Sequence, residues 1–215
     1  MQILCHNNSV YPGERFNSIS HLVGVFLAVA GVSVMMTLAA LTQDPWKIIS
    51  CAVFGAMMIF LYGFSTMYHS LQGPSKKFFL KLDYIAIYLM IAGTYTPFSL
   101  VTLRPTYGWQ IFAVIWGLAI FGIVQEVLRK PSPKKKLSLV LYLLMGWLIV
   151  AVSKTLFSQL SSTAVFLLVA GGISYTSGVL FFVNDDKWKH AHGIWHIFVL
   201  AGSTCHYFCV LLYVI

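Results

Sequence analysis

Seven long apolar segments, separated by short polar or turn-forming stretches, constrain this 215-residue chain more than any other feature. Each segment is roughly 18–24 residues long, enough to cross about 30 Å of hydrocarbon as a helix. Only 9% of the residues are charged, whereas a soluble domain usually carries about 25%. The sequence therefore predicts an all-α integral membrane protein with seven transmembrane helices. Their expected limits are 20–42, 47–71, 83–103, 108–128, 137–154, 161–183 and 191–214.

The segments leave little length for loops, so we expect a single compact bundle that takes in residues 1–215 as one domain. Residues 1–19 are expected to form an N-terminal segment before the first span. This segment lacks the apolar run and cleavage site of a signal peptide. Within the sixth span, the small residues of 170–174 predict tight contacts between helices.

Positive charge is unequally divided between the two sides of the predicted bundle. Because successive spans alternate in direction, each loop can be assigned to one side. Three basic residues share the side opposite the N-terminus: Lys47, Arg104 and Lys154. Eleven share the N-terminal side: Arg15, Lys76, Lys77, Lys81, Arg129, Lys130, Lys134, Lys135, Lys136, Lys187 and Lys189. Lys and Arg are enriched in cytoplasmic loops, so we predict a cytoplasmic N-terminus and an external C-terminus.

The net charge of +8 is spread over short loops beside membrane spans, so we do not expect a nucleic-acid partner. The run Lys134, Lys135, Lys136 is instead expected to contact anionic lipid headgroups. Cys205 and Cys209 are four residues apart on one predicted helix, which leaves metal binding open. Buried free thiols are the expectation for such cysteines.

Two histidines, His192 and His196, begin the last apolar segment and lie one turn apart on one helix face. Polar groups within a membrane span are costly and therefore suggest a function. By the predicted topology, His69 at the end of the second span lies at the same cytoplasmic end. Three histidines that meet there would form a metal site with an open fourth position.

Other polar residues are expected at the same depth. Asp83 begins the predicted third span, and Glu14, Asn17 and His21 share one helical face at the start of the first. Taken singly, each has a structural explanation, such as a carboxylate at a helix N-terminus. Their convergence from separate parts of the sequence on one membrane depth favours a functional cluster.

These motifs resemble the signature of the progestin and adipoQ receptor family. The matching patterns are Glu14-x2-Asn17-x3-His21, Ser65-x3-His69, Asp83 after a short basic loop, and His192-x3-His196. The short chain and the run His192-Gly193-Ile194-Trp195-His196 are similar to the bacterial hemolysin III branch, and the resemblance extends over essentially the whole chain.

The resemblance implies a seven-helix protein of the bacterial inner membrane that binds Zn²⁺. By correspondence of motifs, His69, His192 and His196 would be the metal ligands. Asp83 would hold or activate the water on the zinc, and Ser65 would support the site from one turn below His69. The family also includes members associated with hydrolysis of ceramide and other lipids.

From this site chemistry we predict a zinc-dependent hydrolase of amide-linked or ester-linked membrane lipids in the cytoplasmic leaflet, which would influence lipid homeostasis. Three neutral imidazoles leave zinc its full charge, which lowers the pKa of bound water to about 7. Asp83 would act as the general base. One alternative is a non-catalytic membrane sensor or regulator with structural zinc. A cytolysin is a third, although no span has a polar face along its whole length. The substrate and the oligomeric state stay open.

Overall fold

The computed structural model describes residues 14–128 and 136–215, and within them every regular element is a helix. The helices in the first half of the chain are α1 (Arg15–Leu41), α2 (Pro45–Ser70), α3 (Gly73–Pro97), the π-helical turn η1 (Phe98–Thr102) and α4 (Gly108–Leu128). Those in the second half are α5 (Lys136–Trp147), the 3₁₀ turn η2 (Leu148–Val152), α6 (Ser153–Gln159), α7 (Ser162–Phe182) and α8 (Ala191–Tyr213).

These helices form seven segments that are long and apolar enough to cross a membrane, as predicted. α3 and η1 together make the third segment, and α5, η2 and α6 together make the fifth. The chain is therefore an all-α, multi-pass membrane protein, and seven apolar helices fit a protein of the bacterial inner membrane. Two helices begin at sequence signals: Asp44 accepts a hydrogen bond from the backbone N–H of Trp46, and Ser161 accepts one from that of Ala164.

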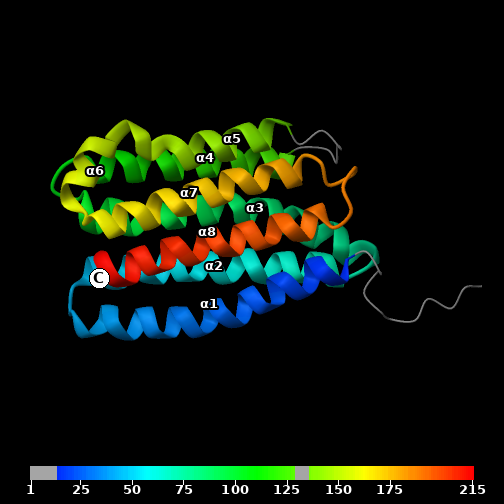
Figure 1. The fold of residues 1–215 in the computed structure, drawn as a ribbon, viewed down its shortest axis with the longest axis horizontal. Helices are drawn as coiled ribbons and strands as arrows, with labels where there is room; N and C mark the ends of the chain where they lie inside the picture. Colours follow the sequence, from blue (N-terminus) through cyan, green and yellow to red (C-terminus); the bar gives the residue numbers. More distant parts are fainter. Residues whose placement is uncertain (1–13, 129–135) are drawn as a thin grey trace, which may run out of the picture.

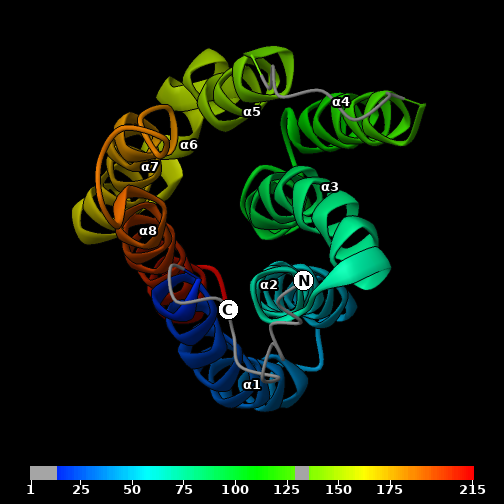
Figure 2. The same ribbon diagram turned by 90° about the vertical axis from the view of Figure 1, so that its right-hand side faces the viewer.

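The helices run along the long axis of the molecule, as Figure 1 shows, and viewed along that axis they are arranged around a ring (Figure 2). α2 packs against α1 and α3, α7 packs against α8, and α8 returns to contact α1. The first and last spans thus lie side by side, although they are far apart in the sequence. This contact brings the start of α1 next to the start of α8.

One end of the bundle gathers the start of α1, the α2–α3 connection and the start of α8, at the right of Figure 1. The C-terminus lies at the opposite end. Each described basic residue lies at the end of the bundle to which the alternating direction of the spans assigned it. Which end faces the cytoplasm stays a prediction. The structure does not describe residues 1–13, residues 129–135 or the side chain of Lys136. The predicted contact of Lys134, Lys135 and Lys136 with lipid headgroups therefore lies outside the described residues.

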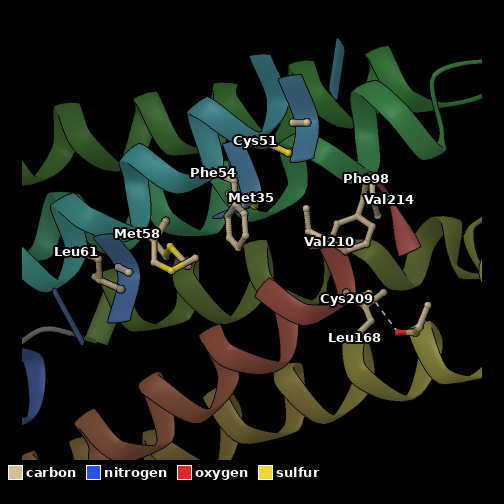
Figure 3. Close-up of a cluster of buried hydrophobic side chains, with 14 of the residues drawn as sticks. Met35, Cys51, Phe54, Met58, Leu61, Phe98, Leu168, Cys209, Val210 and Val214 are labelled. Carbon is tan, nitrogen blue, oxygen red and sulfur yellow. Dashed lines mark hydrogen bonds between the residues drawn. The ribbon is translucent and has the colours of Figure 1, made fainter. Parts of the chain in front are cut away.

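Buried apolar side chains from α1, α2, α3, α7 and α8 form the main core, part of which Figure 3 shows. The contact between α7 and α8 is close at Gly171, where an added Cβ would lie 2.3 Å from the His206 side chain. The small-residue segment therefore makes the tight packing that its composition predicted. His206 donates from Nε2 to the carbonyl of Leu168 across the same interface at 3.1 Å. Cys51, Cys205 and Cys209 are free thiols.

Two spans differ from the sequence expectation. The third helix begins at Gly73, ten residues before the predicted limit at residue 83, so Asp83 lies within α3 and not at its start. The fifth span is interrupted by the 3₁₀ turn η2, whereas one unbroken segment over 137–154 was predicted. Near the end of the third span, Pro97 has no N–H to donate, and the helix continues as the π-helical turn η1.

Candidate metal centre

Three histidines from two helices meet at the end of the bundle where α1 begins. His69 is in the last turn of α2, and His192 and His196 are in the first two turns of α8. Their ring centroids form a nearly equilateral triangle, with separations of 4.9 Å, 5.0 Å and 4.8 Å. One ligand atom from each ring lies within 4.8 Å of the others, so this group could hold a metal ion.

The Nδ1 atom of each ring has its own hydrogen-bond acceptor. His69 Nδ1 contacts Glu14 Oε2, and His192 Nδ1 lies 3.0 Å from Asp185 Oδ2. His196 Nδ1 lies 3.1 Å from the backbone carbonyl oxygen of Asn17. An ionised carboxylate and a carbonyl oxygen only accept hydrogen bonds, so each Nδ1 must carry the proton and donate. In a neutral imidazole, the Nε2 atom then carries the free lone pair.

All three Nε2 atoms are buried and, among the described residues, none has a hydrogen-bond partner. A buried polar atom without a partner is destabilising and calls for an explanation, such as an ion. Metal-bound histidines usually donate their other ring N–H to a carboxylate or a carbonyl, which is the arrangement seen here. Nitrogen atoms around a tetrahedral zinc lie roughly 3.4 Å apart, so small side-chain movements would draw these ligands together. The residues present therefore fit a metal ion.

Glu14, the residue before α1, connects His69 to two other groups. Its carboxylate accepts a hydrogen bond from Asn17 Nδ2 at 3.2 Å and from Lys76 Nζ at 3.1 Å. Partial burial raises the pKa of the Glu14 carboxyl, but His69 and Lys76 outweigh this effect and lower that pKa to about 2. Glu14 is thus ionised near neutral pH and can accept the hydrogen bond that the His69 Nδ1–H donates.

A polar cavity of about 380 Å³ opens beside the histidines. Its lining includes Glu14, His69, His192, Asp185 and Asp83. Asp83 reaches this cavity from the third turn of α3 and is only 5% exposed. The late start predicted for the third helix was wrong, yet the residue still lies at the depth of the histidines.

A second cavity, of about 210 Å³, lies among α3, α5, α7 and α8 and is lined mainly by apolar side chains. Asp83 and His21 also line it. Asp83 therefore stands where the polar and apolar cavities meet. Ser65 is buried on α2, but it lines neither cavity and, among the described residues, its hydroxyl has no hydrogen-bond partner. Its supporting role stays a prediction.

The three polar residues expected at the start of the first span all join the site. The Glu14 carboxylate contacts Nδ1 of His69. The backbone carbonyl of Asn17 contacts Nδ1 of His196. His21 stacks on the ring of His196, with centroids 3.6 Å apart and an interplanar angle of 11°. The shared helical face of these residues was the signal that predicted their proximity.

Two residues of the site were missed by sequence reasoning. Asp185, which accepts from His192, lies in the α7–α8 connection and reads as part of a polar turn. The hydroxyl oxygen of Ser20 lies 3.1 Å from His196 Nδ1, and the same hydroxyl donates a hydrogen bond to the Asn17 carbonyl at 2.9 Å. The sequence did offer a signal for Asp185, an acidic residue seven positions before the histidine pair. No sequence signal pointed to a role for Ser20 at the site.

Comparison with known proteins agrees with the motifs. A family model described as "Haemolysin-III related" matches residues 10–207. The chain is 42% identical to Hemolysin-3 of Bacillus cereus over 205 residues, which cover 94% of this chain and 92% of that protein. It is 40% identical to the Hemolysin-3 homolog of Bacillus subtilis (strain 168) over 206 residues, 93% of each chain.

A more distant relative is the human monocyte to macrophage differentiation factor. It is 29% identical over 192 residues, which cover 86% of this chain and 79% of that protein. The family resemblance drawn from the short motifs is thereby confirmed over most of the chain.

Proposed function

The chain belongs to the haemolysin-III-related family of multi-pass membrane proteins, and we propose that it is a zinc-dependent hydrolase of amide-linked or ester-linked membrane lipids. One observation carries the proposal most directly. Two buried histidines, His69 and His196, and the half-buried His192 have oriented Nδ1 atoms. Their Nε2 atoms are buried and have no hydrogen-bond partner among the described residues, and they lie beside the buried Asp83 carboxylate, which lines both a polar and an apolar cavity.

His69, His192 and His196 would hold the metal ion. Three neutral imidazoles with a nearby carboxylate suit zinc among the divalent metals. When bound, zinc would lower the pKa of water and polarise a carbonyl group at this position. Glu14, Asp185 and the Asn17 carbonyl keep the three imidazoles in the required tautomer and orientation.

Asp83 is the candidate general base. Its carboxylate would take a proton from the attacking water and deliver it to the leaving amine or alkoxide. Its place between the cavities lets it reach water in the polar cavity and a lipid linkage at the mouth of the apolar cavity. The lining of the apolar cavity would hold the acyl chain and exclude water from it.

The depth of the site suits a lipid linkage. His196 is five residues from the start of α8, about 8 Å along the helix axis. At this depth a membrane presents the upper acyl region and the glycerol level of its lipids. Membrane lipids are therefore the expected partners.

The test is release of fatty acid from a broad panel of amide-linked and ester-linked lipids by purified, zinc-loaded protein. We expect activity in the wild type, none in His192→Ala, and retention of zinc without activity in Asp83→Ala. Wild-type protein with bound zinc that releases no fatty acid would contradict the proposal. Equal release by His192→Ala would do the same.

A second candidate is a non-catalytic sensor or regulator in which the ion is a structural clasp. The ligands come from α2 and α8, which flank α1 in Figure 2, so an ion would join spans distant in the sequence. This candidate predicts that a chelator lowers the melting temperature while no lipid is hydrolysed. It also predicts that Asp83→Ala leaves both zinc content and cellular function unchanged.

A further inference from the structure

His21 is a buried histidine that lies beside the candidate metal site but is not one of its three histidines. It lies on the inner face of α1 and is 2% exposed. Among the described residues, neither ring nitrogen has a hydrogen-bond partner. A neutral imidazole carries one donor and one acceptor, so His21 buries two polar atoms at a cost in free energy that a ligand would offset.

The stacking geometry separates His21 from the metal ligands. Its ring lies nearly parallel to that of His196, with centroids 3.6 Å apart. The lone pair of an imidazole nitrogen lies in the plane of its ring, so two parallel rings do not direct their lone pairs to one point. His21 is accordingly outside the group formed by the other three histidines.

His21 instead lines the apolar cavity. The lining around it is largely aliphatic and aromatic and includes Leu61, Met90 and Phe98. Asp83 is the acidic residue of the same lining. A cavity whose largely apolar lining also holds an imidazole and a carboxylate is complementary to a molecule with one polar group and a long hydrocarbon chain.

We propose that His21 is a ligand-binding residue, which forms a hydrogen bond with the amide or ester group of an acyl-chain ligand in the apolar cavity. This inference rests on the proposed lipid substrate and adds the group that recognises its polar linkage. The stack on His196 keeps the imidazole in place, so the bound linkage is held beside the three histidines and Asp83.

The test compares two ligands of equal chain length, hexadecanamide and hexadecane. Each displaces a fluorescent sixteen-carbon probe from purified, metal-loaded protein at fixed detergent concentration. Comparing each variant with the wild type for the same ligand cancels the partition of that ligand into micelles. No turnover is required.

In His21→Phe we expect the Kd for hexadecanamide to rise about tenfold, the size of one lost hydrogen bond. The Kd for hexadecane should change less than about twofold, because phenylalanine keeps the ring and the apolar surface. His21→Gln restores a donor and an acceptor and should bind hexadecanamide within about threefold of the wild type. Metal content should be equal in all three proteins.

Three results would overturn the inference: equal weakening of both ligands in His21→Phe, no change for either ligand, or loss of the metal. Should His21→Phe not fold, His21→Leu replaces it with the same expected result. The result of this binding test can be distinguished from the result of the lipid-hydrolysis test of the proposed function. Amide discrimination without any lipid hydrolysis would leave this inference standing, whereas hydrolysis with unchanged discrimination in His21→Phe would overturn this inference alone.

Discussion

At the scale of single residues, the assignment of protons on three imidazoles determines what the site can bind. Each Nδ1 faces an oxygen that only accepts, so each Nε2 is free to donate a lone pair. The acceptors come from three places: the residue before α1, the first turn of α1 and the α7–α8 connection. The metal affinity should therefore depend on residues that never touch the ion.

Removing a carboxylate that orients a ligand should weaken metal binding. For Glu14→Gln and Asp185→Asn we expect affinity for zinc to fall by about 10–100-fold, because the ring orientation and the tautomer are less constrained. Competition with a chromophoric chelator measures this. Lys77→Gln, a change of an exposed residue near the same end, serves as the control and should bind zinc like the wild type. Unchanged affinity in both acidic variants would contradict the assigned role.

The ligand set itself can be checked by elemental analysis. His69→Ala and His192→Ala should each lose near-stoichiometric zinc, because the two residues belong to one site although they come from α2 and α8. His206→Ala is the matched control. It removes a buried histidine of α8 that bonds the Leu168 carbonyl, and it should retain zinc. Full zinc content in His69→Ala would show that α8 binds the ion without α2.

At the scale of the element, the fifth span shows how a broken helix is tolerated within a membrane. Where α5 gives way to η2, backbone groups lose their regular partners. Tyr95 of α3 replaces them: its hydroxyl donates to the Gly146 carbonyl at 3.0 Å and accepts from the Ile149 N–H at 2.9 Å. Hydrocarbon offers no alternative partner to such groups, so they must be satisfied by the protein.

Tyr95→Phe should therefore lower the free energy of unfolding by about 1–3 kcal/mol, because two backbone groups lose their partner. Unfolding in mixed micelles would measure it. Tyr142→Phe is the matched control, since it removes one hydrogen bond to the Tyr84 carbonyl within α3. We expect Tyr142→Phe to lower the free energy of unfolding less than Tyr95→Phe does. Equal losses in the two variants would mean that the break at η2 does not depend on Tyr95.

The third span shows why an apolar pattern locates a helix better than it locates the helix ends. Residues 73–82 contain Pro74, Lys76, Lys77 and Lys81 and read as a basic loop. In the structure they form the first turns of α3, which packs against α2. Hydropathy reports the thickness of the hydrocarbon, and a helix that extends into the interface keeps its charged residues in water.

At the scale of the whole molecule, the ring of helices brings three distant parts of the chain to one end. The three histidines that could hold a metal ion belong to α2 and α8, and their hydrogen-bond partners belong to the start of α1 and the α7–α8 connection. An ion bound there would tie together the first, second and seventh spans.

Binding to the folded state alone should raise stability with metal concentration. At a free zinc concentration of 100 times the Kd, we expect about 2.7 kcal/mol of added stability in the wild type. His192→Ala should show no such gain, because the site has lost a ligand. Thermal unfolding with and without a chelator measures both. A wild-type melting temperature that does not respond to zinc would contradict a role for the ion in holding the spans together.

The orientation of the bundle is a further prediction at this scale. The excess of Lys and Arg at the end that holds the histidines predicts that this end is cytoplasmic and that the C-terminus is outside. A C-terminal alkaline phosphatase fusion should be active, whereas a C-terminal green fluorescent protein fusion should be dark. The opposite pattern would place the histidines on the external side.

The sequence by itself determined the number of spans, the helical class and the end at which the polar residues gather. These properties follow from hydrocarbon thickness and from the period of a helix, both of which act on neighbouring residues. It also identified the three histidines and the α1 face that meets them. Only the tertiary structure decided which nitrogen of each histidine ring has no hydrogen-bond partner among the described residues. It also decided that Asp185 and the Asn17 carbonyl face Nδ1 atoms of these rings, and that His21 stacks on His196. It also decided where Asp83 lies between two cavities. These depend on how each helix is rotated and shifted against its neighbours, which is set by packing among segments far apart in the chain.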